Sequence, residues 1–203
     1  MFIHSQYGCR RKIAKAVAFG CGLLVLVNSA RPVRADDSVP VARQVVILMR
    51  VLAYDGNLKS RAGDTVNIAI LRKKGHAASE SMANVMAQAF GALAVTQVSG
   101  LPIVVSRLNF TGEDALRKAI TGAGIDFVYV CDGLDADLDA IERVTRQLKV
   151  MSVGSKQSQV EKGLTIGVFQ MEDKCTILLN LSASRLEGIS FAADLLRLAK
   201  VIR

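Results

Sequence analysis

Short apolar segments alternate with segments of helical spacing along most of this 203-residue chain, and that alternation constrains the fold more than any other feature. Val66 to Leu71 and Ile125 to Cys131 are apolar and contain β-branched residues, which is typical of buried strands. Met82, Met86 and Phe90 recur at the spacing that places them on one face of a helix. Apolar strands joined through helices predict a largely parallel sheet that is covered on both faces.

The expected elements follow from the same two periodicities and from turn residues between them. We expect strands at residues 66–71, 101–108, 125–131, 150–153, 164–171 and 174–181. We expect helices at residues 41–54, 79–93, 112–121, 135–148, 182–187 and 190–202, and a loop at 154–163. The strands on either side of Glu172 and Asp173 form an antiparallel hairpin by length. The predicted fold class is therefore α/β, with three layers, a mostly parallel sheet, a C-terminal antiparallel hairpin and helices on both faces.

The first 35 residues differ from the rest of the chain. They carry a basic segment around Arg10 to Lys15, followed by 15 largely apolar residues from Ala16 to Ala30. A membrane-spanning helix needs about 20 residues, whereas the core of a signal peptide needs about 7–15. We interpret residues 1–35 as a cleaved export signal, with an uncleaved anchor as the alternative, and residues 36–203 as a single domain.

The distribution of charge excludes a nucleic-acid-binding domain. The formal net charge is +8, but residues 1–35 hold six Lys and Arg and no acidic residue. The remaining chain has 20 basic and 18 acidic side chains, so it lacks the basic excess that phosphate binding requires. A hydrophobic content of 51% excludes a disordered chain, and we expect no nucleic-acid partner.

No motif for catalysis, a metal or a cofactor follows any predicted strand, so we expect no catalytic residue, no metal and no cofactor. His76 and Glu80 share a helical spacing, but nothing nominates the third ligand that a catalytic metal needs. The basic segment Arg72, Lys73, Lys74 and His76 follows the first strand and precedes a helix, a position that favours anions. Asp132 lies near it if the first and third strands are neighbours. This loop is either a ligand- or partner-binding patch or a solvated surface loop.

The cysteines leave two interpretations open. After removal of residues 1–35, Cys131 and Cys175 remain. In an oxidising compartment they form a disulfide or redox pair, or they are two buried thiols that pack as small apolar side chains. Spacing in sequence does not distinguish these, because a disulfide depends on the distance between the two Cα atoms.

The C-terminal third resembles the closing segment of the YfiR-like family of periplasmic proteins. Its pattern is a strand, a turn before a basic residue, a strand ending in Asn-Leu, and a helix with Leu-Leu-x-Leu-Ala. The matching positions are Gly167, Asp173, Lys174, Asn180, Leu181, Leu186, Leu195, Leu196, Leu198 and Ala199. Many members also carry a Trp-Pro pair after the first helix, whereas this chain contains no Trp.

This resemblance implies a non-enzymatic periplasmic regulator. Such a protein binds and restrains the periplasmic part of a membrane-anchored signalling protein, here a diguanylate cyclase, and its release raises cyclic-di-GMP and biofilm formation. We also consider a homodimer. The alternatives are a periplasmic receptor for a small anion or solute at residues 72–76, and a hydrolase built around His76, for which no nucleophile is nominated.

Overall fold

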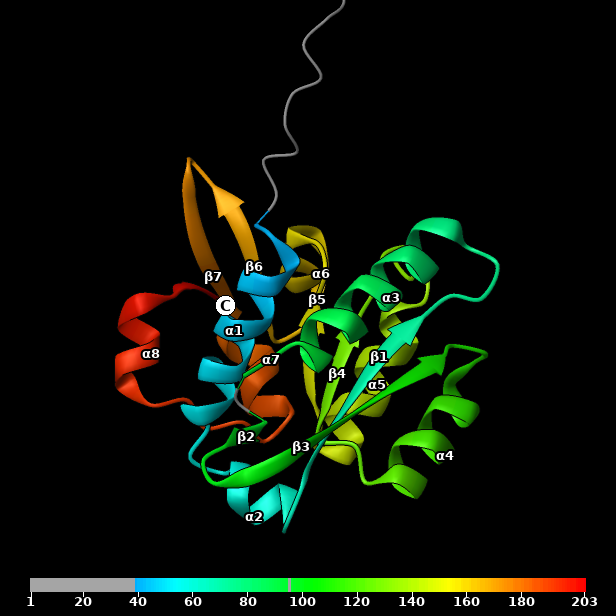
Figure 1. The fold of residues 1–203 in the computed structure, drawn as a ribbon, viewed down its shortest axis with the longest axis horizontal. Helices are drawn as coiled ribbons and strands as arrows, with labels where there is room; N and C mark the ends of the chain where they lie inside the picture. Colours follow the sequence, from blue (N-terminus) through cyan, green and yellow to red (C-terminus); the bar gives the residue numbers. More distant parts are fainter. Residues whose placement is uncertain (1–38, 95) are drawn as a thin grey trace, which may run out of the picture. The chain divides into compact units, whose positions relative to one another are not determined.

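A computed structural model describes residues 39–94 and 96–203. The described residues form an eight-stranded mixed sheet with the order β2-β3-β1-β4-β5-β6-β7-β8 (Figure 1). The strands are β1 Val66–Arg72, β2 Gln97–Val98, β3 Leu101–Asn109, β4 Phe127–Val130, β5 Met151–Gly154, β6 Ile166–Met171, β7 Lys174–Asn180 and β8 Lys200–Ile202. The helices are α1 Val41–Ala53, α2 Leu58–Ala62, α3 Ala77–Gly91, α4 Glu113–Ala123, α5 Leu138–Leu148, α6 Gln157–Lys162, α7 Leu181–Leu186 and α8 Ala193–Leu198. The predicted export signal, residues 1–35, lies outside the described residues.

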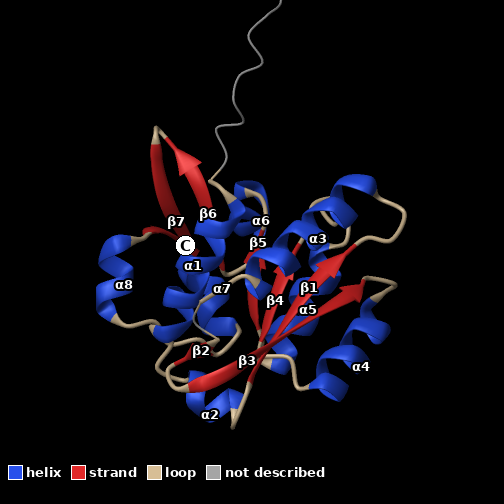
Figure 2. Ribbon diagram, in the orientation of Figure 1, coloured by secondary structure: helices blue, strands red, loops and turns tan. Residues whose placement is uncertain are grey.

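The predicted α/β class with three layers is confirmed (Figure 2). On one face of the sheet, α1 and α3 bury side chains such as Leu48 and Met86 against Ile68 and Phe127. The opposite face is covered by α4 and α5. Its buried residues include Leu116, Ile120, Ile141 and Val144 from the helices, with Leu71, Val128 and Val130 from the sheet. The strands β3, β1, β4, β5 and β6 are parallel, and β6 and β7 form the predicted antiparallel pair.

Two predicted segments were wrong. Residues 154–163, expected as a loop, contain α6, because Gln159 and Val160 are fully buried and anchor this polar segment. The Gln159 Oε1 atom accepts hydrogen bonds from the N–H groups of Ser155 and Lys156, which satisfies the start of the helix. The segment was predicted as a loop because it is polar, and polarity does not reveal that one of its amide side chains is buried.

The predicted helix at residues 190–202 was also wrong. Only Ala193–Leu198 is helical, and the chain becomes extended at Ala199 and forms β8 parallel to β7. The apolar spacing continues through Val201 and Ile202, but these β-branched residues pair with Leu179 and Asn180 in the sheet. The short elements α2 and β2 were not predicted, since each has too few residues to show a period.

A buried ion pair joins the start of the domain to its last segment. The side chain of Asp55 is fully buried, and its Oδ2 atom lies 2.7 Å from an Arg61 nitrogen. The Oδ1 atom of Asp55 accepts from the backbone N–H of Asn57 at 3.0 Å and of Ser190 at 3.1 Å. Arg61 also donates to the carbonyl oxygen of Lys149 at 2.8 Å. The Asp55–Arg61 pair therefore ties together the residues after α1, the residues before α8 and the residue after α5.

A second buried acid directly follows α7. Glu187 is fully buried, and its Oε2 atom accepts from the Ser152 N–H at 2.8 Å and the Thr165 hydroxyl at 2.5 Å. Its Oε1 atom has no hydrogen-bond partner among the described residues. Burial raises the pKa of Glu187, and the hydrogen bonds from Ser152 and Thr165 offset only part of that effect.

Candidate functional site

The strand order places a topological switch point at the carboxyl ends of β1 and β4. The chain leaves β1 through α3 on one face of the sheet and leaves β4 through α5 on the other. Ligands of open α/β sheets bind at such a point, where the strand order reverses. The structure brings together here the predicted residues Lys73, His76 and Asp132, because β1 and β4 are neighbours, which was the condition for their proximity.

The lysines at this switch point are paired with carboxylates. The Nζ atom of Lys73 lies 2.9 Å from Asp137, and the Nζ atom of Lys156 lies 3.2 Å from Asp135 and 3.7 Å from Asp132. Asp132 also accepts from the Ser155 hydroxyl at 2.7 Å. Three carboxylates thus accompany these lysines, and the surplus positive charge that an anion would need is absent from these contacts.

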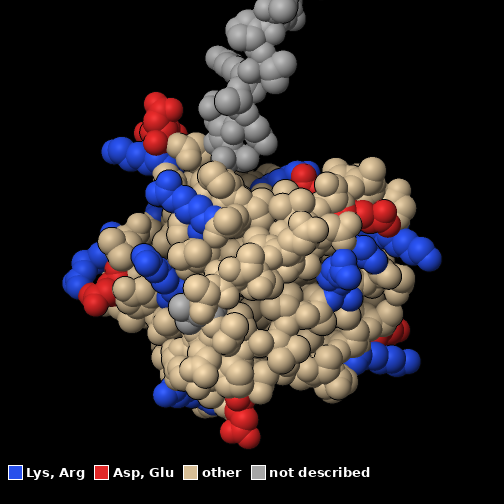
Figure 3. Space-filling model, viewed as in Figure 1, with Lys and Arg blue, Asp and Glu red and all other residues tan. Residues whose placement is uncertain are grey.

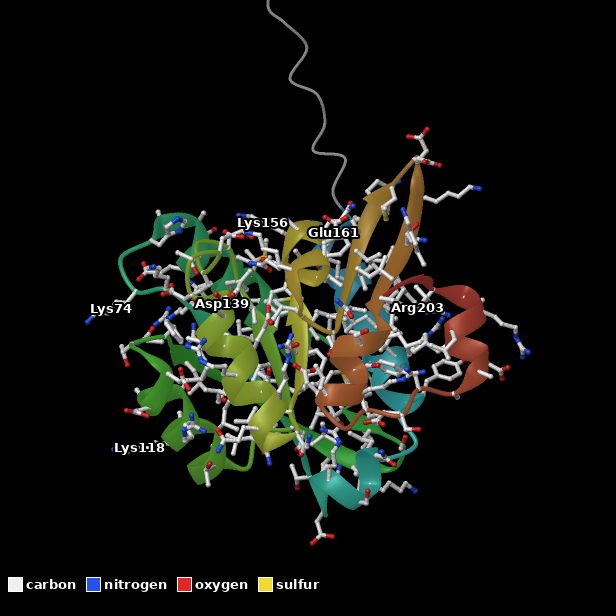
Figure 4. The ribbon with its side chains drawn as sticks, turned by 180° about the vertical axis from the view of Figure 1, so that it is seen from behind. Lys74, Lys118, Asp139, Lys156, Glu161 and Arg203 are labelled. Atoms are coloured by element: carbon white, nitrogen blue, oxygen red, sulfur yellow. The ribbon has the colours of Figure 1, made fainter. Side chains whose placement is uncertain are left out.

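The other residues of the predicted patch have separate roles. Lys74 is exposed and points away from the domain (Figure 4). Arg72 lies on the sheet, where its Nε donates to Asn109 Oδ1 at 2.8 Å. The Nδ1 atom of His76 accepts from the Ser79 N–H at 3.2 Å and caps α3. The structure therefore uses His76 as a helix cap.

His76 packs closely against the loop after β4 at this switch point. Gly133 has φ +81°, and a Cβ atom there would lie 2.8 Å from three atoms of the His76 ring. Only glycine combines this backbone conformation with so close an approach. The β1–α3 loop and the β4–α5 loop are thus fitted to each other.

The two cysteines lie on strands that are not adjacent. Cys131 directly follows β4 and is buried, Cys175 is in β7 and is partly exposed, and both are free. Because β5 and β6 lie between them, the strand spacing alone separates them by roughly 14 Å. A disulfide needs Cα atoms within about 7 Å, so this arrangement of strands does not allow the pair to form. Burial also raises the pKa of Cys131 to about 12, which suppresses its thiolate.

Residues 39–94 and 96–203 contain neither a metal-binding cluster nor a membrane-spanning helix. No group of three or more His, Cys, Asp or Glu side chains within these ranges is placed to hold a metal ion. None of the helices in these ranges is long and apolar enough to cross a membrane.

An apolar groove borders α1 on the side of β2. It has a volume of about 360 Å³. Its lining comes from Val46, Met49, Arg50 and Ala53 of α1 and from Leu93, Ala94, Gln97, Val98 and Ser99 at and around β2. Val46 remains 42% exposed at the rim. We call this the α1–β2 groove.

A second groove borders α1 on the side of β7 and α8, and we call it the α1–α8 groove. It has a volume of about 260 Å³. Its lining consists of Arg43, Ile47, Arg50, Val51 and Tyr54 of α1 and the residue after it, Cys175 and Ile177 of β7, and Leu195 and Leu198 of α8. Leu198 is 69% exposed. Figure 3 shows this face of the domain as mostly uncharged, with Lys and Arg side chains over the region of α1 and α8.

Sequence reasoning missed both grooves, although a signal was present. The segment 41–53 has apolar side chains on every side of the helix, with only Arg43, Gln44 and Arg50 as polar residues. A helix that is apolar all round is normally buried all round. Since α1 covers the sheet with one side only, the remaining apolar side chains are left to line grooves.

The fold is a mixed α/β domain that is shared with several solved structures. A conserved domain protein from Vibrio cholerae O1 biovar El Tor superposes with a TM-score of 0.56 and 14% identity, covering 81% of this chain and 60% of that protein. The ABC domain from Streptococcus pneumonia, solved in complex with L-Trp, gives 0.54 and 15%, covering 80% and 62%. The ligand-free, open structure of a substrate binding protein with adhesive properties from Clostridium difficile gives 0.52 and 12%, covering 76% and 59%. The chain spans about three fifths of the length of each, and these identities show a shared fold alone.

The chain belongs to the YfiR/HmsC-like family, whose profile matches residues 45–200. Comparison with curated proteins gives no match. The match confirms the predicted family and covers every strand from β1 to β7. The family to which the chain belongs is one associated with periplasmic regulation of cyclic-di-GMP signalling.

Proposed function

We propose that this protein is a non-enzymatic periplasmic regulator that binds and restrains the periplasmic part of a membrane-anchored diguanylate cyclase. The observation that carries the proposal is the family match over residues 45–200. The export signal expected at residues 1–35 accords with it, since the partner's sensing part faces the same compartment.

The α1 helix supplies the contact surface in this proposal. It lies between the α1–β2 groove and the α1–α8 groove, and Arg50 borders both. Exposed apolar side chains next to concave apolar surface are characteristic of protein-binding sites. Arg is enriched at the centre of such interfaces, where its planar head group makes several hydrogen bonds. A partner that inserts apolar side chains into both grooves would clasp α1.

The anion- or solute-receptor alternative has less support. Its predicted residues lie at the carboxyl ends of β1 and β4, where Asp132, Asp135 and Asp137 neutralise Lys73 and Lys156. His76 is committed to capping α3 and packing on Gly133.

The test is direct binding of the full chain to the isolated periplasmic part of the diguanylate cyclase encoded nearest to it, measured by biolayer interferometry. Val46→Asp places a charge in the α1–β2 groove and should lower the affinity about tenfold or more, because a buried charge without a partner opposes binding. Leu186→Asp is the matched control, since Leu186 is 50% exposed but lies on α7. Absence of binding by the unmodified chain would refute the function, and equal losses in both variants would refute the role of α1.

A further inference from the structure

Most of β3 has a neighbouring strand on one side only. β1 pairs with β3 along residues 103–109, whereas β2 pairs only with Leu101 and Pro102 on the other side. Beyond them, the Ile103 N–H donates to the Thr96 carbonyl at 3.0 Å. Beyond Ile103, no residue within the described ranges pairs with this outer side, and we call residues 103–109 the open edge, although the N–H of Ile103 is already used.

The backbone of the open edge offers unpaired hydrogen-bonding groups. Because N–H and C=O directions alternate along a strand, Val105 and Arg107 present theirs on the same side as Ile103. Even-numbered residues face β1 instead, as shown by the Phe110 N–H at the end of the strand, which donates to the Arg72 carbonyl at 2.8 Å. Proteins usually blunt such an edge with proline, a bulge or a covering element. Here the proline is Pro102, where β2 already pairs.

A groove runs along the open edge, between β3 and α3. Its volume is about 630 Å³. Its lining consists of Ile103, Val105 and Arg107 of β3, of Asn84, Ala87, Gln88, Phe90 and Gly91 of α3, and of Thr96. The three β3 side chains are two residues apart, which is the period of a strand. An added strand would therefore direct every second side chain into this groove.

Positive charge without an acidic partner marks one end of the groove. Arg107 donates to Asn84 Oδ1 at 2.8 Å, and Arg72 donates to Asn109 Oδ1 at 2.8 Å. Neither arginine takes part in an ion pair among the residues that the structure describes. Because Arg72 pairs in register with Asn109 and Arg107 with Ile70, both side chains lie on the α3 side of the sheet.

We propose that the open edge of β3 binds an extended, acidic segment of the partner protein as an added strand, with an Asp or Glu side chain against Arg107. This adds a second contact with the partner, besides the one at α1, and it rests on the proposed function. Strand addition uses the free backbone groups for affinity and the groove for selectivity. A second copy of this chain fits less well, because antiparallel pairing of two β3 edges would bring Arg72 and Arg107 of both copies into one small interface without an acid.

The probe is a fluorescently labelled heptapeptide, acetyl-Glu-Thr-Val-Thr-Val-Thr-Glu-amide, titrated against the full chain and followed by fluorescence anisotropy. Its length matches residues 103–109, and a Glu at each end serves either strand direction. Two further peptides carry N-methyl groups on residues 2, 4 and 6 or on residues 3, 5 and 7. Since only one of these sets donates to β3, we expect one methylated peptide to lose about tenfold or more in affinity while the other binds like the parent.

Arg107→Glu should weaken binding of the parent peptide about tenfold or more. Lys118→Glu, the same charge reversal at an exposed position on α4, is the matched control and should leave it unchanged (Figure 4). Circular dichroism of both variants verifies folding. No binding, equal effects of the two methylation patterns, or dimerisation of the chain through this edge in light scattering would each overturn the proposal. If the cyclase still binds while Arg107→Glu changes nothing, the edge fails and the proposed function stands.

Discussion

Replacing Asp55 with Ala is predicted to destabilise the domain severely, because it leaves a buried arginine without its carboxylate. The Asp55 side chain is fully buried, and that of Arg61 is 14% exposed. Removing one partner of a buried ion pair typically costs about 3–5 kcal/mol in the free energy of unfolding. Asp55 also loses the hydrogen bonds that it accepts from Asn57 and Ser190, which places the expected cost toward the upper end of that range.

A control separates burial from charge. Lys73 and Asp137 form an ion pair at 2.9 Å, but their side chains are 42% and 26% exposed. Pairs of this kind contribute about 0–1 kcal/mol, so Asp137→Ala should be mild. At roughly 2–4 °C per kcal/mol for a domain of this size, we expect the melting temperature to fall by about 6–20 °C for Asp55→Ala and by less than about 4 °C for Asp137→Ala.

Thermal unfolding followed by circular dichroism measures both shifts under the same conditions. The double variant Asp55→Ala, Arg61→Met removes the stranded charge as well and should recover part of the loss. Two results would contradict the reasoning: a shift for Asp55→Ala as small as that for Asp137→Ala, or a double variant that is less stable than Asp55→Ala alone.

Three further predictions concern a buried acid, a glycine and the thiols. Burial raises the pKa of Glu187, so above about pH 4.3 the unfolded state releases a proton that the folded state still holds. The free energy of unfolding therefore falls as the pH rises through the pKa of the folded state. Urea unfolding at pH 5 and pH 8 should show a smaller fall for Glu187→Gln than for the unmodified chain, and equal falls would refute this. Gly133→Ala should destabilise the domain by about 1–3 kcal/mol through its positive φ and its contact with His76, and His76→Ala in the same chain should recover part of that loss in thermal unfolding. Iodoacetamide labelling followed by peptide mass spectrometry should modify Cys175 well before Cys131, whose thiol is buried, and equal rates would contradict the structure.

The centre of the sheet was predictable because β1 and β4 are mostly apolar. Most of their residues are buried, so the sequence shows short, largely apolar segments with β-branched members. The end of α4 was equally clear, since Gly124 adopts the left-handed conformation that ends a helix. The residues within these segments determine both features, so a single sequence is enough to predict them.

The remaining elements and surfaces depend on tertiary contacts. The α6 helix forms because one glutamine is buried, and β8 forms because β7 offers it an edge. The proximity of the loops after β1 and β4 depended on those strands being neighbours, and the ion pairs there depend on Asp135 and Asp137 in the loop after β4 and on Lys156 in the loop after β5. The grooves beside α1 and the open edge of β3 depend on the lengths of the neighbouring strands and helices. A local sequence pattern does not predict how far those neighbours extend.

The junction between the two ends of the domain has a consequence for synthesis. The Gly56 N–H donates to the Ser190 carbonyl at 2.9 Å, and the Ala192 N–H donates to the Tyr54 carbonyl at 3.0 Å. The apolar helix α1 is synthesised early, and it meets its last packing partners only after α8 has been made. A polypeptide cut short after residue 186 would keep that helix partly uncovered, and it should be a preferred client of holding chaperones and proteases.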